Sequence, residues 1–307
     1  MSMSTEELLK ARQAMVHHIF SCTGDEFISE VLKNGRGAPS ALTEDMKQEM
    51  RVEEYAWHDF IWWKFMPAGA PKGKTRKVLY LHGGGWVLES GIVQYQFAGY
   101  LSEKLGCEVW FPEYPLVPEH NGEIALDMVF DLYRQMLESA AGDEIAIGGD
   151  SAGAGLAVSL VQHLIQKGLA LPNTLLLVSP ALFCFDSSRN REEQEYMDIT
   201  AKRDPVISLN AFPTVLQHWK GSLDAEDYRV NPSTAALKGF PATIVFSGGY
   251  ESMERGIRTF VEKMIALDLD VRYYVRNRKI HNFVLSEPDA EAERNLIVQR
   301  LLDPDHN

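Results

Sequence analysis

Residues 144–155 read EIAIGGDSAGAG, and this stretch indicates how the chain folds. A short apolar run leads up to Ser151, and apolar residues follow it at helical spacing as far as Leu164. We therefore expect a strand, a sharp turn and a helix, with the serine at the turn. Gly149 and Gly153 flank the serine because no side chain fits where the strand and the helix pass so closely. Ser151 should adopt a strained backbone conformation that exposes its hydroxyl.

The G-x-S-x-G spacing around Ser151 is a weak signal by itself. At ordinary glycine and serine frequencies, about one chain in ten of this length contains the pattern by chance. A glycine-rich turn between a strand and a helix can also bind phosphate. The spacing differs from the dinucleotide-binding and P-loop patterns, however, and this favours a nucleophilic serine over a phosphate site.

A second motif, HGGGW at residues 82–86, directly follows the strand-like residues 77–81. At ordinary glycine and histidine frequencies, the run HGGG occurs by chance in about one such chain in several hundred. Consecutive glycines let backbone N–H groups point into a cavity with no Cβ in the way. Such donors suit an oxygen that gains negative charge in a transition state, and losing one typically costs about 3 kcal/mol of barrier.

These two motifs, in this order and 66 residues apart (151 minus 85), resemble those of the hormone-sensitive-lipase-like branch of the α/β-hydrolase esterases. YPLVPEH at 114–120 resembles the family's Y-R-L-A-P-E segment, with Pro115 and Val117 as departures. DPVIS at 204–208 and NP at 231–232 resemble landmarks of its cap and of the loop that returns to the sheet. The resemblance covers the chain after residue 50 and implies a serine carboxylesterase.

The bulk properties of the chain limit its partners. It has 307 residues, enough for one large α/β domain, and a formal net charge of −13. This charge argues against nucleic acid and anionic membrane surfaces as partners. The cysteines are widely spaced and are interpreted as reduced thiols: Cys22, Cys107 and Cys184. Without a signal-peptide pattern or an apolar run of about 18 residues, we expect a soluble, cytoplasmic protein.

The alternation of apolar and helical stretches predicts an α/β-hydrolase fold, with a mostly parallel sheet flanked by helices. A hairpin is expected at 53–65, ahead of helices at 94–105 and 124–137 and a further helix through Phe260 and Met264. Besides the strand before Ser151, we expect strands at 78–81, 108–111, 174–178, 242–247 and 271–275. Active sites in such sheets lie at the carboxyl ends of the strands.

Two segments depart from this alternation. Residues 1–50 predict two amphipathic helices, which the resemblance places in a lid over the active site, where Met15, Phe20 and Phe27 either line the lid or pack it. Residues 183–230 separate two strands and are interpreted as a partly helical cap insertion, because so long an unstructured loop would be unusual. We therefore divide the chain into an N-terminal helical cap segment, 1–50, and a catalytic domain, 51–307, that contains this insertion.

A serine hydroxyl becomes a nucleophile when a base takes its proton and an acid orients the base. In α/β-hydrolases the order is Ser, Asp or Glu, then His. Glu251 follows strand 242–247, where the family places its acid, and Glu254 is the nearby rival, more often a solvated or helix-terminal charge. His281 lies 30 residues later (281 minus 251) in KIHNF. The family usually has glycine where this chain has Asn282, a residue that tolerates left-handed backbone conformations.

The predicted site is completed by what the resemblance implies. Backbone N–H groups of Gly83, Gly84 and Ala152 would bind the oxyanion. The supporting motif residues are His82, Gly85, Gly149, Asp150 and Gly153. The eight histidines other than His281 are interpreted as packing, loop-shaping or surface residues. No histidine or cysteine spacing indicates a metal, and no cofactor is expected.

The predicted function is hydrolysis of small, short-chain acyl or aryl esters through a Ser-His-Glu triad, with a small-molecule ester as the substrate. Two alternatives stay open. The same machinery could act on amides, carbamates or lactones, since one oxyanion hole serves all of these. The second alternative is a ligand receptor of the same fold that has no catalytic activity. The oligomeric state is also open between a monomer and a homodimer, because terminal helices and edge strands often pair in the family.

Overall fold

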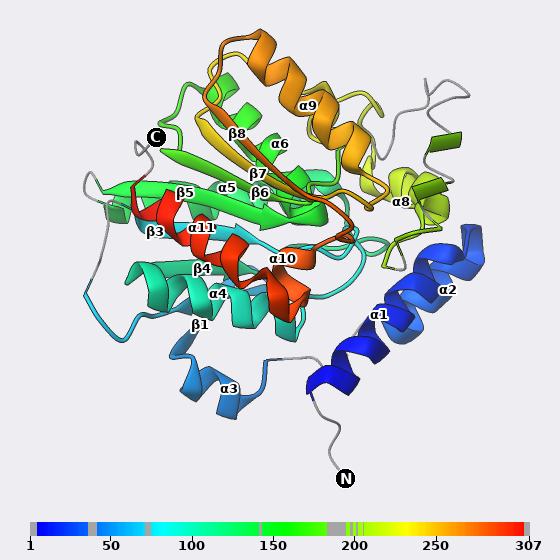
Figure 1. The fold of residues 1–307 in the computed structure, drawn as a ribbon, viewed down its shortest axis with the longest axis horizontal. Coiled ribbons are helices and arrows are strands. Elements are labelled where there is room, and N and C mark those ends of the chain that lie inside the picture. Colours follow the sequence, from blue (N-terminus) through cyan, green and yellow to red (C-terminus); the bar gives the residue numbers. More distant parts are fainter. Residues whose placement is uncertain are drawn as a thin grey trace.

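An eight-stranded sheet runs through the molecule in the order β1-β2-β4-β3-β5-β6-β7-β8 (Figure 1). The structure is a computed structural model that describes residues 5–35, 42–70, 75–140, 143–182, 195–196, 199–200, 202–204 and 206–303. The strands are β1 Val52–Trp57, β2 Phe60–Phe65, β3 Thr75–Leu81, β4 Glu108–Pro112, β5 Glu144–Asp150, β6 Thr174–Val178, β7 Ala242–Gly248 and β8 Val271–Arg276. From β4 to β8 all neighbouring strands are parallel, whereas β1 and β2 form an antiparallel hairpin.

This architecture confirms the predicted fold class. The hairpin lies where the sequence indicated it, β6 has the predicted bounds, and β4, β7 and β8 each extend one residue beyond theirs. Strands β4, β6 and β7 are buried on both faces, which is why they read as continuous apolar runs rather than as alternating ones. The parallel edge strand β8 is only partly buried.

Alternate side chains of each central strand enter two separate cores. In β3, Leu79 and Leu81 belong to one core, and Val78 and Tyr80 belong to the other. The first core is covered by α5 Gly122–Ala140, α6 Ser151–Lys167 and α9 Glu254–Ala266. The second is covered by α4 Ile92–Leu105, α10 Phe283–Ser286 and α11 Glu291–Leu302. Figure 1 shows α9 on one side of the sheet and α4 and α11 on the other.

The N-terminal helices lie side by side at one end of the molecule, close to α8 (Figure 1). They are α1 Thr5–Ser21 and α2 Gly24–Asn34, and α8 spans Phe212–Trp219. Phe20 joins them, because its ring centroid lies 5.9 Å from that of Phe27 in α2 and 5.7 Å from that of Phe212 in α8. Two segments that are distant in the sequence therefore share one apolar contact.

Part of the predicted insertion at 183–230 falls outside the described residues, including Phe183, Phe185 and Cys184. Its described part contains the short 3-10 helix η1 Leu209–Ala211 and α8, and η2 Pro232–Thr234 follows it. Phe212 and Trp219 of α8 are buried, and Trp219 packs against Trp86 with ring centroids 5.3 Å apart. This part of the chain therefore packs onto the glycine motif that precedes Trp86.

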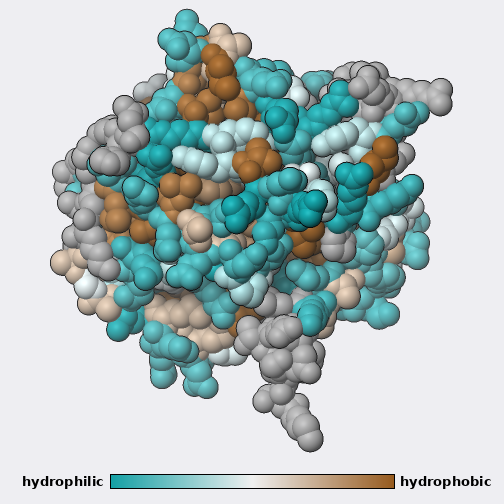
Figure 2. Space-filling model, viewed as in Figure 1, coloured by the Kyte–Doolittle hydropathy of each residue, from teal (hydrophilic) through white to brown (hydrophobic). Residues whose placement is uncertain are grey.

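The outer surface is mainly polar on the face drawn in Figure 2, where apolar groups form small, separate areas. Ile265 and Leu267, at the end of α9, are 62% and 50% exposed. Among the described helices, none has the length and apolar composition needed to cross a bilayer. The strongly apolar side chains are thus concentrated in the two cores that hold the sheet and its helices together.

Candidate active site

Ser151 occupies the turn between β5 and α6. Its φ of 51° is a left-handed value that a residue with a Cβ rarely adopts, so the predicted backbone strain at the serine is present. The first turn of α6 passes very close to β3, because a Cβ added at Gly153 would lie 2.1 Å from the carbonyl oxygen of Leu81. Only glycine fits at position 153, and the turn presents the Ser151 side chain at the carboxyl end of the sheet.

His281 and Glu251 come to this serine from two other strand ends. The Ser151 Oγ lies 2.8 Å from His281 Nε2, and His281 Nδ1 lies 2.8 Å from Glu251 Oε2. The second carboxylate oxygen of Glu251 accepts the N–H of Gly248, at 2.9 Å, at the end of β7. All three side chains are buried. One imidazole therefore bridges a hydroxyl and a carboxylate, with both of its nitrogens in use.

Glu254, the rival carboxylate, points to other partners. As the first residue of α9 it is a helix-terminal charge, but it is buried rather than solvated. It accepts hydrogen bonds from Tyr196 and Tyr273, each at 3.2 Å, and pairs with Arg258. The cost of this burial is offset because the two tyrosine hydroxyls and the guanidinium replace the water that such a carboxylate would otherwise bind.

The glycine motif after β3 lies directly against Ser151. A Cβ added at Gly83 would stand 3.0 Å from the Ser151 Cβ and 2.4 Å from Asp150 Oδ2. Gly84 and Gly85 line the same pocket as Ser151. Ala152 is buried in the first turn of α6. The structure thus brings the predicted oxyanion-hole residues to the serine.

His82, the first residue of this motif, contacts Gly83 and Tyr114. Its Nδ1 lies 2.7 Å from the carbonyl oxygen of Gly83, and its ring stacks on Tyr114 with centroids 4.3 Å apart. The Tyr114 hydroxyl donates to the carbonyl oxygen of His82, at 2.6 Å. His82 therefore fixes the path of the backbone, which agrees with its interpretation as a loop-shaping residue.

Comparisons with known proteins show which family the chain belongs to. A family described as alpha/beta hydrolase fold matches residues 78–285. The chain belongs to this α/β-hydrolase fold family. An esterase of Acinetobacter venetianus is 30% identical, over 70% of this chain and 69% of its own length. A carboxylesterase/phospholipase of Mycobacterium tuberculosis is 34% identical, over 74% of this chain and 61% of its own.

Solved structures are similar over nearly the whole chain. The crystal structure of an esterase from the bacterial hormone-sensitive lipase family matches with a TM-score of 0.72 and 23% identity, covering 98% of each chain. At that identity the match shows the fold. Together with the esterase relatives, it identifies the protein as a carboxylesterase-type hydrolase.

Asp150 connects three segments of the hydrolase beneath the serine. This fully buried carboxylate accepts hydrogen bonds from Tyr80, at 3.1 Å, Gln94, at 3.1 Å, and Asn282, at 2.9 Å. Burial raises the pKa of Asp150, and the hydrogen bonds offset only part of this effect. The residue next to Ser151 therefore connects β3, α4 and the loop that carries His281.

Asn282 is the chain's departure from the family's glycine, and it has a structural role. Its φ is 57°, so asparagine occupies the left-handed conformation that it was expected to tolerate. Its N–H donates to Ser179 Oγ, at 3.1 Å, while its side chain reaches Asp150. A glycine would fit this backbone but could not make the side-chain bond, which links the histidine loop to the serine strand.

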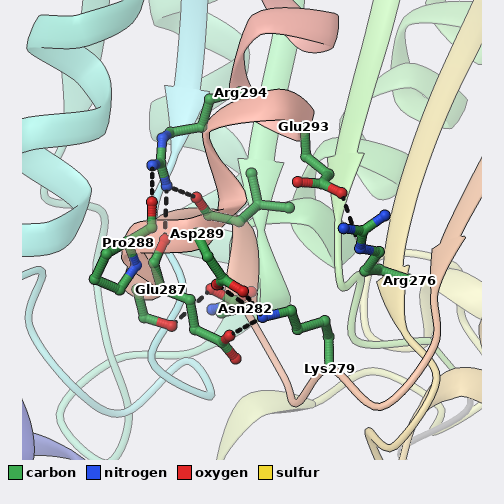
Figure 3. A network of polar contacts seen from close by, with 10 residues as sticks. Arg276, Lys279, Asn282, Glu287, Pro288, Asp289, Glu293 and Arg294 are labelled. Carbon is green, nitrogen blue, oxygen red and sulfur yellow. Dashed lines mark hydrogen bonds and ion pairs between the residues drawn. The ribbon is translucent and has the colours of Figure 1, made fainter.

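The same loop is held from its outer side by charged residues (Figure 3). The Lys279 ammonium pairs with Glu287 and with Asp289, the latter at 2.7 Å. Arg294 of α11 donates to three backbone carbonyl groups, those of Val284, Glu287 and Pro288. These contacts link Lys279, just before His281, to residues that follow it, and they link those residues to α11.

Electrostatic effects on His281 act in both directions. Burial by itself lowers the pKa of the imidazole, but the hydrogen bond and charge of Glu251 and the nearby charge of Asp204 raise it, so that the pKa lies above its ordinary value. Asp204 is fully buried. The sequence did not indicate that the charge of Asp204 acts on His281, although the DPVIS segment that contains Asp204 resembles a landmark of the family's cap.

A pocket of about 100 Å³ opens above Ser151 and His281. Helix α1 contributes Arg12, Gln13, Val16 and Phe20 to its wall. The remaining wall is formed by residues of several loops and helices, among them Leu88, Val93, Gln94, Val206, Ile207, Asn282 and Ser286. Of the three cap residues considered from sequence, Phe20 lines the pocket, Phe27 packs behind it, and Met15 is half-buried against the core.

A larger cavity of about 590 Å³ lies beside the β1–β2 hairpin and residues 113–120. We take the smaller pocket as the candidate site because Ser151 and His281 line it. Within the described ranges, no group of three or more histidine, cysteine, aspartate or glutamate residues could hold a metal ion.

Proposed function

We propose that this hydrolase cleaves small carboxylic esters, with Ser151 as nucleophile, His281 as general base and Glu251 as the acid that orients the base. The observation that supports the proposal most is the chain of hydrogen bonds from Glu251 through His281 to Ser151, with distances of 2.8 Å on both sides of the imidazole. A buried serine without a base would be a poor nucleophile, and a histidine without an acid could adopt the wrong tautomer.

The proposed reaction has two acyl-transfer steps. The Ser151 oxygen attacks the ester carbonyl carbon while its proton moves to Nε2 of His281. Backbone N–H groups of Gly83, Gly84 and Ala152 donate to the resulting oxyanion. The carbon–oxygen bond to the alcohol then breaks, and His281 gives the alcohol its proton. Water attacks the acyl-serine in the same way, which releases the carboxylic acid and restores the serine.

The size of the pocket supports a short acyl group. Its volume of about 100 Å³ lies well below the range of about 300–1,000 Å³ typical of sites for larger ligands. Apolar side chains from α1 and from the segment at 206–207 would surround an acetyl or butyryl chain, whereas a long chain would have to leave the pocket.

A substrate series tests this function. The purified protein should hydrolyse p-nitrophenyl acetate and butyrate with kcat/KM of about 10⁴ M⁻¹s⁻¹ or more. We expect the decanoate to be at least about tenfold slower and the matched butyryl p-nitroanilide at least about a hundredfold slower. Equal rates on ester and anilide would favour an amidase. No turnover, together with no labelling by a fluorophosphonate, would favour the receptor alternative.

The pH profile should follow His281. The imidazole must be neutral to accept the serine proton, and the pKa of His281 is raised above its ordinary value of about 6.5. The kcat/KM for p-nitrophenyl butyrate should therefore rise with pH through a pKa above 6.5, with activity lost on the acidic side where His281 is protonated. Measurements between about pH 5 and about pH 9 would show this limb. A limb centred below 6.5 would contradict the assignment.

A further inference from the structure

Asp204, in the chain between β6 and η1, brings a carboxylate to the loops that carry Glu251 and His281. Its side chain is fully buried, and its Oδ1 accepts the N–H of Val206, at 3.0 Å. Among the described residues, Oδ2 has no hydrogen bond of ordinary geometry. The backbone N–H groups of Ser252 and His281 also lie near this carboxylate and favour its charged form. One buried carboxylate therefore faces both the residue that follows the acid and the base itself.

The loops that carry the acid and the base also contact each other directly. The N–H of Tyr250 donates to the carbonyl oxygen of Lys279, at 2.9 Å. A Cβ added at Gly248 would stand 2.4 Å from the same oxygen. A side chain that faces both loops at this point can hold their spacing, and with it the distance of 2.8 Å between the acid and the base.

Three buried carboxylates act on the imidazole of His281, and they come from three different parts of the chain. Burial lowers the pKa of His281, whereas Glu251 after β7, Asp204 before η1 and Asp150 at the end of β5 raise it. Burial and, in part, the charge of Asp204 also raise the pKa of Glu251. Repulsion among these carboxylates is relieved when the imidazole takes up a proton. The site therefore stabilises a positive charge on His281, and more strongly than water would.

The segment that carries Asp204 also forms part of the pocket. Val206 and Ile207 line the pocket together with Ser151 and His281. Ile207 is buried and belongs to the core on that side of the sheet. The same short segment therefore shapes the pocket wall and sets the position of the carboxylate beside the base.

We propose that Asp204 is a positioning residue for the proposed reaction: it holds the loops of Glu251 and His281 together and supplies a further negative charge to the imidazolium that forms during acyl transfer. No bond to Asp204 forms or breaks, and the serine proton still moves to Nε2 of His281. This inference rests on the proposed function, and it assigns to the segment before η1 a role in the chemistry as well as in the pocket wall.

Replacing Asp204 by asparagine tests the role of its charge, because the amide oxygen can still accept the N–H of Val206. The acidic limb of kcat/KM for p-nitrophenyl butyrate should move to lower pH by about half a unit or more, since loss of a nearby negative charge lowers the pKa of His281. On the alkaline plateau kcat should fall, by up to about tenfold for each unit of that shift, with little change in KM. Asp204→Glu keeps the charge and should move the limb less.

Asp224→Asn is the matched control. Asp224 is exposed, and its Oδ1 accepts the N–H of Glu226, at 2.9 Å, which is the contact that Asp204 makes with Val206. This variant should leave the limb and the plateau unchanged. A limb at the wild-type pH in folded Asp204→Asn, with only stability or KM altered, would mean that Asp204 merely packs its segment, and it would overturn the proposal. If Asp204→Asn does not fold, Asp204→Ser, whose hydroxyl can accept the same N–H, is judged by the same criterion.

A titration without turnover separates this inference from the proposed catalysis. The imidazole of His281 is followed by NMR against pH in the Ser151→Ala protein, with and without Asp204→Asn, and its signal is assigned by its loss in His281→Gln. A lower midpoint with Asp204→Asn would support the role of Asp204 even if the wild type hydrolysed no ester. Equal midpoints would overturn it, whatever the turnover.

Discussion

Replacing Ser151 by alanine should reduce kcat for p-nitrophenyl butyrate by at least about 10⁴-fold, because loss of a serine nucleophile in a triad leaves only the oxyanion hole and substrate binding to act. The substitution removes one oxygen and keeps the Cβ in the same strained turn, so the fold should be preserved. Steady-state kinetics and labelling with a fluorophosphonate would measure the effect, and labelling should disappear.

Ser159→Ala is the matched control on the same helix. Ser159 Oγ donates to the carbonyl oxygen of Tyr228, at 2.7 Å, so this change should lower the free energy of unfolding by about 1 kcal/mol. It should leave kcat close to that of the wild type. If Ser151→Ala retained a large fraction of wild-type turnover while remaining folded, the proposed nucleophile would be wrong.

Glu251→Gln should lower kcat by about 10³- to 10⁴-fold, as amide substitution does in a related triad. The glutamine amide cannot stabilise the imidazolium that forms when His281 takes the serine proton, and it favours the wrong tautomer of the ring. Glu251 is fully buried, and its carboxylate bonds both His281 Nδ1 and the N–H of Gly248. The effect should therefore be far larger on kcat than on KM.

Glu254→Gln separates the two candidate acids. Glu254 bonds Tyr196 and Tyr273 and pairs with Arg258, so this variant should lose about 1–3 kcal/mol of stability while kcat changes little. Thermal unfolding and kinetics on the same preparations would measure both quantities. The reverse pattern, with kcat lost in Glu254→Gln and kept in Glu251→Gln, would exchange their roles.

Much of the fold was predictable from sequence because its signals are local. Apolar runs of strand length and helical spacing lie within short windows, and they indicated the parallel strands and the helices between them. Helix α11 was not predicted. Its large apolar residues are confined to its second half, where Ile297, Val298 and Leu301 share one face, and packing against α4 shows how these residues become buried.

The candidate site, like the fold, was predictable from sequence only where its signals are local. The strand, turn and helix at Ser151 and the glycine motif before Trp86 could be recognised because tight turns require particular residues at particular spacings. The order of Ser151, Glu251 and His281 came from the resemblance to a family. Their distances of 2.8 Å depend on parallel strands that end at one edge of the sheet.

The amino-acid sequence by itself determined the α/β class, the sharp turn with its serine, and the glycine motif, since each depends on backbone geometry within a few residues. Only the tertiary structure decided which distant side chains meet there. The bond from Asn282 to Asp150, the burial of Asp204 beside His281, and the contact of Arg12 with Gly91 join segments that no local pattern relates. Such contacts arise when helices and loops pack on the completed sheet, and they shape the pocket that surrounds the serine.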